Sequence, residues 1–356
     1  MSVRQEFIDA FGRSPLAFGK ASGRVNLIGE HVDYNGGTVL PTAIRQGANV
    51  ALAPSTGKVD RIVSNGFGDG VFRHPGGPKQ DHWADYAAGA LEKARQLGLM
   101  STCVDLTISS NVPGGAGLSS SAALVTAILR AASDLAGMST DPETLAHAAR
   151  AVENDYIGVP CGIMDQLAVG LCDFGEALAL NTETGLYTKI PIPNDWAFAV
   201  FHSGVHRKLS DGRYGERFRE CADAADLLNV SHLSLLSDDR LSDAAKLPPN
   251  LAARTRHVVG DHRRTISAID AMRRADMPAF AKLMNESHRS YAADFAASTP
   301  EIDTLVSTAL VEGASGARLT GGGFGGCIVA LMPKASAADI INCIEVASPT
   351  ARFLGE

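Results

Sequence analysis

The sequence predicts an α+β protein folded as two lobes, and three observations support this prediction. The chain has 356 residues, more than one hydrophobic core usually serves, so two packed lobes with a cleft between them are expected. Hydrophobic residues make up 45% and charged residues 20% of it, which is typical of globular proteins. Strand-like and helix-like patterns follow one another along the chain. We expect one lobe at 1–185 and another at 186–356.

The expected first lobe begins with a helix and continues as turn-rich strands. The helix covers Val3–Phe11, and a β segment follows at Ala48–Ala53 after the chain enters a loop at Gly23–Ile28. Apolar and polar residues alternate over Val104–Ser109, which is the period of a half-buried strand. An Ala/Leu-rich run at Ala122–Leu135 then predicts a well-covered helix.

Further helices and strands are expected on both sides of the lobe change. Asp141–Tyr156 has an acidic start and a proline at its first turn, as helices often do, and another helix begins near Gly162. The second lobe is expected to contain strands at Trp196–Phe201 and Ile328–Leu331 and helices at Tyr214–Leu228, Arg254–Arg274, Pro278–Phe295 and Ala337–Val346. We find no internal repeat.

Charge and cysteine content narrow the class of partner. The formal net charge is −7 and both signs are interspersed, so no broad footprint for nucleic acid or an anionic membrane is present. The six cysteines form no C-x-x-C pair. The N-terminus lacks the pattern of a signal peptide, and no apolar stretch approaches a membrane span. We expect a cytoplasmic protein, a monomer, whose partners are small molecules.

A glycine-rich segment stands between the predicted strand and the predicted helix. It reads Pro113-Gly114-Gly115-Ala116-Gly117-Leu118-Ser119-Ser120-Ser121. A loop of small residues entering a helix points backbone N–H groups and the helix dipole at one place, which suits a phosphate. Its hydroxyls can also bind a hydrated Mg²⁺. The lysine of the Walker pattern is absent, and a mobile connector with a capping serine explains the segment about as well.

Another polar segment lies near the N-terminus, at 23–37. Glu30, His31 and Asp33 are crowded between glycines there. Carboxylates accept hydrogen bonds from hydroxyl groups and histidine can donate or accept, so this cluster suits recognition of a polyhydroxy ligand. The residues Asp-Tyr-Asn-Gly-Gly are also typical of a solvated turn, and composition alone favours that simpler interpretation.

Three ordered motifs resemble those of galactokinases, members of the galacto-, homoserine, mevalonate and phosphomevalonate kinase superfamily. The segment Gly23–Tyr34 resembles the galactokinase signature, Gly115–Ala123 the ATP loop, and Leu319–Cys327 the C-terminal glycine motif. Cys161–Gln166 is similar to the catalytic segment of the family. The resemblance extends over Phe18–Pro333, nearly the whole chain.

The resemblance implies a two-lobed sugar-kinase fold with a mixed-sheet N-terminal lobe, an α+β C-terminal lobe and the active site between them. The residues implied to hold the sugar are Glu30, His31, Asp33 and Tyr214. Those implied to bind the nucleotide are Gly115, Ala116, Gly117, Leu118, Ser119, Ser120, Ser121 and Trp83, the last beside the adenine. Those implied to hold Mg²⁺ are Ser121 and Glu153, which stands twelve residues before Asp165.

The same resemblance assigns the chemistry to Asp165 and Arg24. Asp165 would be the catalytic base facing the anomeric hydroxyl, while Arg24 would keep that carboxylate ionised and stabilise charge on the transferring phosphoryl group. Taken singly, Asp165 at a helix start is more often a cap, and Tyr214 is more often half-buried packing. Their positions in matched motifs favour the functional roles. Cys161 is interpreted as a packing residue, and Gly321–Gly326 as a hairpin turn or a wall of the nucleotide site.

Some positions depart from the family's pattern. Ser22 stands where a proline usually precedes Gly-Arg, and Val32 replaces a common threonine. Gly260-Asp261-His262 stands where Thr-Glu-Asn is frequent, and Gly212-Arg213-Tyr214 replaces Ser-Glu-Tyr. The positions that would carry the chemistry are intact, so these departures bear on the choice of sugar.

The implied activity is Mg²⁺-assisted transfer of the γ-phosphate of ATP to the C1 hydroxyl of D-galactose, giving galactose 1-phosphate and ADP. One alternative is the same chemistry on a related sugar, such as a C2-modified galactose or arabinose. Another is a non-catalytic galactose-sensing regulator. The complete run Ser119–Ala123 favours catalysis, because some sensing relatives have lost residues from the serine loop.

Overall fold

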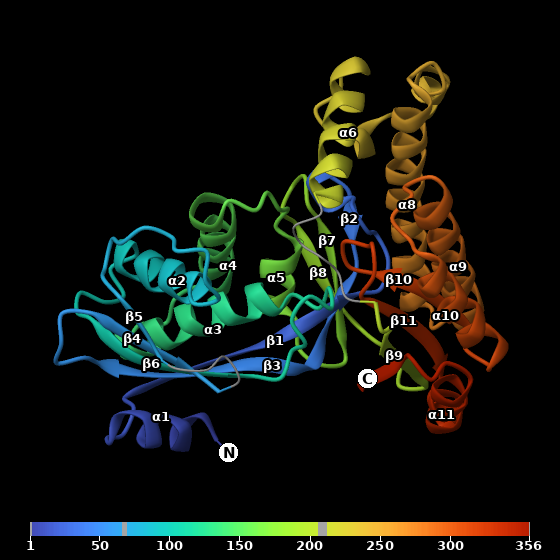
Figure 1. Ribbon diagram of the computed structural model, residues 1–356. Helices are drawn as coiled ribbons and strands as arrows, with labels where there is room; N and C mark the ends of the chain where they lie inside the picture. The colour runs from blue at the N-terminus through green and yellow to red at the C-terminus, as the bar shows by residue number, and fades with distance from the viewer. Residues whose placement is uncertain (1, 66–69, 206–211, 356) are drawn as a thin grey trace. The chain divides into compact units, whose positions relative to one another are not determined.

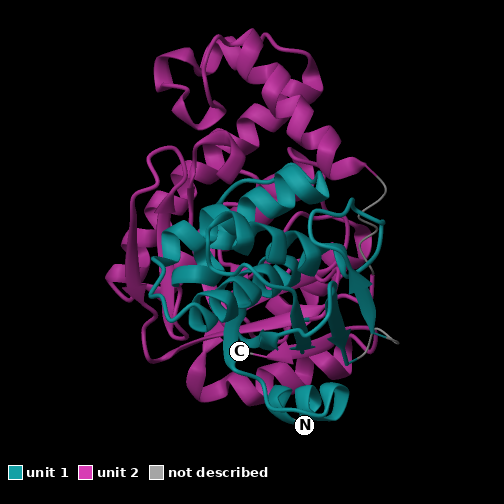
Figure 2. Ribbon diagram, turned by 90° about the vertical axis from the view of Figure 1, so that its left-hand side faces the viewer, with its two compact units in different colours: residues 1–23, 45–112, 119–171 teal, residues 24–44, 113–118, 172–356 magenta. Residues whose placement is uncertain are grey.

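The computed structural model describes residues 2–65, 70–205 and 212–355. The chain divides into two compact units, each assembled from several stretches of sequence (Figure 2). The first unit comprises residues 1–23, 45–112 and 119–171, and the second comprises residues 24–44, 113–118 and 172–356. In the described part of the chain the strands form one mixed and one antiparallel sheet, with helices packed on them. The predicted α+β class is confirmed.

The strands of the first unit belong to the mixed sheet. They are β1 (Ala17–Asn26, up to Gly23 in this unit), β3 (Pro41–Pro54, from Arg45), β4 (Asp60–Ser64), β5 (Val71–Arg73) and β6 (Val104–Ser110). Strand β3 pairs antiparallel with β6, β6 pairs parallel with β4, and β4 pairs antiparallel with β5. The two strands predicted from the sequence are therefore neighbours, with Val50 opposite Ile108.

Alternation along β3 separates two apolar clusters. Val50 and Leu52 join the large core of the unit, whereas Ala51 and Ala53 pack with Phe7 in a small one. The large core is completed by helices α2 (Asp85–Gln96), α3 (Ser120–Leu135), α4 (Pro142–Ala151) and α5 (Met164–Leu171), and the small one by α1 (Val3–Phe11). Successive strand side chains point to opposite faces, so α1 lies across the sheet from α2 and α3, as Figure 1 shows.

The second unit contains short strands of the mixed sheet and the whole antiparallel sheet. Its strands are β2 (Thr38–Val39), β7 (Glu176–Asn181), β8 (Tyr187–Pro191), β9 (Trp196–His202), β10 (Gly316–Thr320), β11 (Cys327–Pro333) and β12 (Arg352–Gly355). The antiparallel sheet has the order β10-β11-β9-β12. Strands β10 and β11 are consecutive and pair from Gly316 opposite Leu331 to Thr320 opposite Cys327. The glycine motif Gly321–Gly326 is thus the loop of a hairpin.

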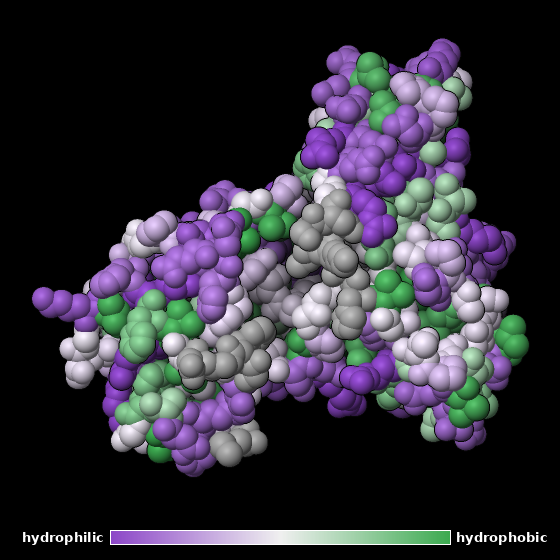
Figure 3. All heavy atoms as spheres, viewed as in Figure 1, coloured by the Kyte–Doolittle hydropathy of each residue, from purple (hydrophilic) through white to green (hydrophobic). Residues whose placement is uncertain are grey.

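Helices make up most of the rest of the second unit. They are α6 (Arg213–Leu227), α7 (Leu241–Ala244), α8 (Pro249–Arg273), α9 (Met277–Ala293), α10 (Pro300–Val311) and α11 (Ala337–Ala347). Four 3₁₀ turns, η1 (Asp33–Asn35), η4 (Leu233–Leu235), η5 (Asp238–Arg240) and η6 (Lys334–Ser336), are also described in this unit. Figure 1 shows α8 and α9 running side by side. The part of the surface formed by α6 and α8 is mostly hydrophilic in Figure 3, in keeping with the charged sequence of α6.

Several helices begin where their capping residues predict. The carboxylate of Asp141 accepts the backbone N–H of Thr144 at 2.9 Å, and Pro142 occupies the first turn of α4. Asp276 accepts the N–H of Ala279 at 3.0 Å at the start of α9. Such caps satisfy N–H groups that a helix leaves unpaired.

The structure differs from the expected elements in several ways. The segment expected to enter a loop at Gly23–Ile28 is strand as far as Asn26, within β1. The helix expected over Asp141–Tyr156 ends at Ala151, and Val152–Ile157 continues as the π-helical turn η2. Such turns are rare, but those that exist are frequently found at functional sites, and no residue pattern predicts them. Helices α2 and α10 and the short strands were not expected, although the Thr299 cap and Pro300 at the start of α10 were local signals of a helix.

No helix in the described ranges is both long and apolar enough to cross a membrane.

Candidate active site

The predicted base Asp165 lies in the first turn of α5, in the first unit. Its Oδ2 accepts a hydrogen bond of 2.6 Å from the hydroxyl of Ser119. The start of a helix favours a carboxylate, because the N–H groups there create a positive potential. Ser119 precedes α3 with φ 56° and ψ 44°, and its side chain does not cap that helix. The last part of the predicted phosphate loop is therefore joined to the predicted base by a side-chain hydrogen bond.

The two predicted metal residues also come together in the first unit. Glu153 lies in the π-helical turn η2 and is 7% exposed. The hydroxyl of Ser121 lies 3.4 Å from both of its carboxylate oxygens. The side-chain amide of Gln166, the residue after Asp165, donates to Glu153 Oε1 at 3.1 Å. No group of three or more His, Cys, Asp or Glu side chains suited to a metal occurs among the described residues.

Trp83 lies just before α2 and packs, half-buried, against the large core of the first unit. Its ring centroid lies 5.4 Å from that of His82. The predicted place of Trp83 beside the adenine stays a prediction.

In the second unit, Glu30 is held at its backbone and at its side chain. Its backbone N–H donates to Asp261 Oδ2 at 3.2 Å, and its carbonyl lies 3.2 Å from His257 Nε2. Asp261 and His257 are four residues apart, on one face of α8. The carboxylate Oε1 accepts the Gly321 N–H at 2.8 Å and the Arg318 guanidinium at 3.3 Å. Burial raises the pKa of Glu30, although the charges of Arg318 and Arg24 oppose that shift.

His31 takes part in a chain of hydrogen bonds with two tyrosines. Its Nδ1 lies 2.7 Å from the Tyr34 hydroxyl, and its Nε2 lies 2.9 Å from the Tyr291 hydroxyl. Tyr291 donates to the carbonyl of Gly321 at 2.7 Å, so its oxygen accepts from His31 Nε2–H. Tyr34 then donates to Nδ1, and burial raises its pKa far above the usual value, which keeps the phenol protonated. The backbone of His31 is left-handed, with φ 60°.

Asp33 and Tyr214 lie close to this chain. Asp33 begins the short turn η1 and is partly exposed. Tyr214 lies in the first turn of α6, half-buried, with its ring centroid 5.2 Å from that of His31. The second unit therefore brings together the four predicted sugar residues, which come from segments nearly 200 positions apart.

Arg24 and the glycine hairpin contact the first part of the phosphate loop. Arg24 donates from Nη1 to the carbonyl of Gly117 at 2.6 Å. A Cβ at Gly321 would lie 2.9 Å from that same oxygen, and a Cβ at Gly326 would lie 3.0 Å from the carbonyl of Ala116. Both hairpin positions have positive φ, so glycine is required for the close approach. Arg24 and Asp165 belong to different units, and their predicted pairing stays a prediction.

Five residues of this arrangement were not predicted as site residues. They are His257, Asp261, Tyr291, Arg318 and Gln166. Arg318 had a signal in the sequence, since it is a lone charge between apolar neighbours in a strand that leads into the glycine motif, and it is fully buried. For His257 and Asp261 the sequence signal was weaker: the two residues stand four positions apart, beside Val258.

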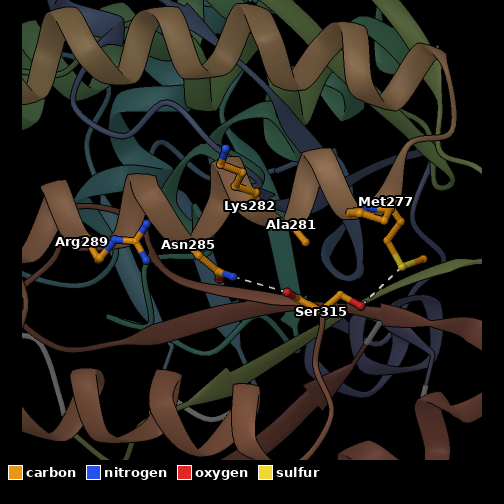
Figure 4. Close-up of a pocket in the computed structure, with 7 residues that line it drawn as sticks. Met277, Ala281, Lys282, Asn285, Arg289 and Ser315 are labelled. Carbon is orange, nitrogen blue, oxygen red and sulfur yellow. Dashed lines mark hydrogen bonds between the residues drawn. The ribbon is translucent and has the colours of Figure 1, made fainter.

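A surface pocket of about 460 Å³ lies elsewhere in the second unit (Figure 4). It is lined by α9 residues such as Lys282, Asn285 and Arg289 and by Ser315. Asn285 uses its amide to accept the N–H of Ala317 at 2.9 Å, which supports β10. None of the predicted site residues lines this pocket.

Matches to known families and proteins along the chain all point to the same group of kinases. Residues 5–54 match the galactokinase galactose-binding signature. Residues 85–172 match the GHMP kinases N terminal domain, and residues 268–346 match the GHMP kinases C terminal domain. The galactokinase of Chloroflexus aggregans is 39% identical over 332 residues, which are 90% of this chain and 85% of that protein. The chain belongs to the galactokinase family.

Solved structures place this galactokinase-family chain in the same fold. The galactokinase of Lactococcus lactis complexed with galactose has a TM-score of 0.93 at 30% identity, covering 99% of this chain and 96% of that one. The mevalonate kinase of Methanococcus jannaschii has a TM-score of 0.71 at 18% identity, covering 96% and 98%, and shows likeness of fold alone. The predicted sugar-kinase fold is therefore confirmed.

Proposed function

We propose that this chain transfers the γ-phosphate of ATP to the C1 hydroxyl of galactose, giving galactose 1-phosphate and ADP. Membership in the galactokinase family supports the sugar and the reaction. The structural observation that carries the proposal is the hydrogen bond of 2.6 Å between Asp165 and Ser119. It joins the candidate base to a loop whose backbone suits a triphosphate, as a transfer between ATP and a hydroxyl requires.

In this mechanism Asp165 accepts the proton of the C1 hydroxyl while that oxygen attacks the γ-phosphorus. The bond from the γ-phosphorus to the bridging oxygen breaks, and ADP keeps that oxygen with its electron pair. Arg24, held against the loop carbonyl of Gly117, offsets negative charge on the transferring phosphoryl group. A lobe boundary near residue 185 is also part of this proposal.

The nucleotide is proposed to lie along the loop of small residues. Backbone N–H groups of Gly115–Leu118 and the hydroxyl of Ser120 would bind phosphate oxygens, with the glycine hairpin Gly321–Gly326 as the adjacent wall. The contact between this hairpin and the Ala116–Gly117 carbonyls supports that arrangement. Trp83 is proposed to flank the adenine.

Ser121 and Glu153 fit the magnesium ion that the family implies. Their hydroxyl and carboxylate oxygens are the hard ligands that Mg²⁺ prefers. The amide oxygen of Gln166 is buried without a hydrogen-bond partner among the described residues, and a water molecule on the ion would satisfy it. When bound, Mg²⁺ supplies neutralisation of charge on the β- and γ-phosphates. The hydrogen bond from the Gln166 amide would keep the Glu153 carboxylate oriented to hold the ion.

The sugar is proposed to contact Glu30, His31, Asp33 and Tyr214. Both ring nitrogens of His31 already have protein partners, so its ring orients the segment and its polar groups act mainly through the tyrosines. Asp33 is partly exposed beside them and is proposed to accept hydrogen bonds from the ring hydroxyls that distinguish galactose from its epimers. The cytoplasmic location and the monomeric state belong to this proposal as well.

A coupled ADP-release assay across a panel of aldoses tests the proposed function. We expect turnover that requires both ATP and sugar, with galactose giving the highest kcat/KM, and the Asp165→Asn variant as the matched control. A clear preference for a C2-modified galactose or for arabinose would change the acceptor. Galactose binding by calorimetry without any ADP release would show a sensor, and would overturn the kinase assignment.

A further inference from the structure

Two of the three serines at the start of α3 have different carboxylate partners in the structure. Ser119 donates to the carboxylate of Asp165, and Ser121 to that of Glu153. Ser119 is also the more buried of the two, with 7% of its surface exposed. A loop serine that only bound phosphate would gain nothing from a bond of 2.6 Å to a neighbouring carboxylate, since both groups would compete for its one proton.

We propose that Ser119 is a positioning residue for the base Asp165 rather than a ligand of the nucleotide phosphates. This inference rests on the proposed function. Ser119 donates its hydroxyl proton to Asp165 Oδ2, and the carboxylate keeps lone pairs to accept the proton of the sugar hydroxyl. Ser120 is then the serine of the loop that serves the phosphate, and Ser121 the one that serves the metal carboxylate.

The backbone of Ser119 supports this division. At φ 56° and ψ 44° the residue is left-handed, a conformation that glycine adopts far more easily than serine. A serine at the residue before a helix normally caps it, yet the Ser119 side chain makes no such bond. Both the strained backbone and the missing cap follow from a side chain that turns away from α3 to reach the first turn of α5.

The bond acts on catalysis through geometry. A general base must lie within hydrogen-bond reach of the proton that it removes, and small displacements of a catalytic group lower the rate steeply. Hydrogen bonds between a hydroxyl and a carboxylate at this distance are short and strong, so Ser119 restricts the rotation of the Asp165 side chain. Removing the hydroxyl would take away this restraint on the Asp165 side chain and leave the backbone N–H groups of the loop in place.

The test compares Ser119→Ala, Ser119→Gly and Ser119→Thr in single-turnover phosphoryl transfer, together with KM for ATP and thermal unfolding. We expect Ala and Gly to slow transfer equally, by about 10- to 100-fold, with KM for ATP changed less than about threefold. Thr keeps the hydroxyl and should recover part of the rate, while its branched side chain strains the left-handed backbone, so its variant should unfold below wild type. Gly relieves the backbone strain, so its variant should unfold about 2 °C or more above the Ala variant. The rate of phosphoryl transfer in these variants would then depend on the presence of the hydroxyl and not on the unfolding temperature.

A double-mutant cycle with Asp165→Asn makes the test specific, and Ser120→Ala is its matched control. In the Asp165→Asn background, Ser119→Ala should change the remaining rate less than about threefold, whereas Ser120→Ala should keep its full effect on KM for ATP. A normally active wild type in which Ser119→Ala only raises KM for ATP would overturn this inference and leave the proposed function standing. A wild type that releases no ADP with any aldose would overturn both.

Discussion

Two buried histidines should make the protein less stable as the pH falls from 7 to 5. Burial lowers the pKa of His257 to about 4, with Asp261 opposing the shift only in part. Burial likewise lowers the pKa of His288 to about 4, against the opposing charge of Asp303. Each folded-state pKa lies below the ordinary value of 6.5. The unfolded chain therefore takes up these protons first, and stability present above pH 6.5 is lost as the pH falls toward the folded value.

The size of the loss follows from the same values. A histidine with a pKa of 6.5 unfolded and about 4 folded contributes a loss of about 2 kcal/mol between pH 7 and pH 5. Two such residues would together remove about 4 kcal/mol. The free energy of unfolding of a folded domain is typically about 5–15 kcal/mol, so this loss is a large part of it. The window lies above the range in which most carboxylates titrate.

Urea unfolding at pH 7 and pH 5 measures this effect for wild type and for His257→Gln. Glutamine can still donate to the Glu30 carbonyl, which lies beside the His257 ring, but it does not titrate. We expect the variant to lose about 2 kcal/mol less than wild type between the two pH values. His147→Gln, at an exposed position of α4, is the control and should keep the wild-type loss. An equal loss in His257→Gln and wild type would refute the reasoning.

Three further predictions concern the proposed site. Asp165→Asn should still bind galactose in calorimetry but lose roughly 10²–10⁴-fold in kcat, because an amide cannot accept the proton, and near-normal turnover would remove Asp165 from its role. Glu153→Gln should raise the Mg²⁺ concentration for half-maximal activity, and Ser121→Ala should do so more weakly; titrations of both that superimpose on wild type would place the metal elsewhere. Asp33→Ala should lower kcat/KM for galactose and shrink the galactose-to-glucose ratio, which should be about tenfold or more in wild type. A wild type that prefers glucose, or a ratio unmoved by the substitution, would contradict the assignment of Asp33.

Much of the secondary structure could be predicted from local sequence patterns alone. The apolar spacing of Val3–Phe11 and the cap and proline at Asp141–Pro142 place helices α1 and α4 where they are found. The alternation over Val104–Ser109 placed the central strand β6, but the half-buried character that it predicted is wrong, since the polar residues Asp105 and Thr107 are buried as well. These signals are local, since periodicity and capping depend on residues a few positions apart. The end of α4 in a π-helical turn at Val152 has no such signal.

By itself the sequence determined the family and the order of the motifs, and it named the residues to which the proposed chemistry is assigned. Glycines at 321 and 326 mark places where a side chain would crowd the neighbouring backbone, and that requirement is visible in the residue type. Only the tertiary structure decided which partners these residues take. Ser119 meets Asp165 across 46 positions, and Arg318 meets Glu30 across 288. Such pairings depend on how elements pack rather than on local pattern, which is why the serine that serves the base could not be told from the serines beside it.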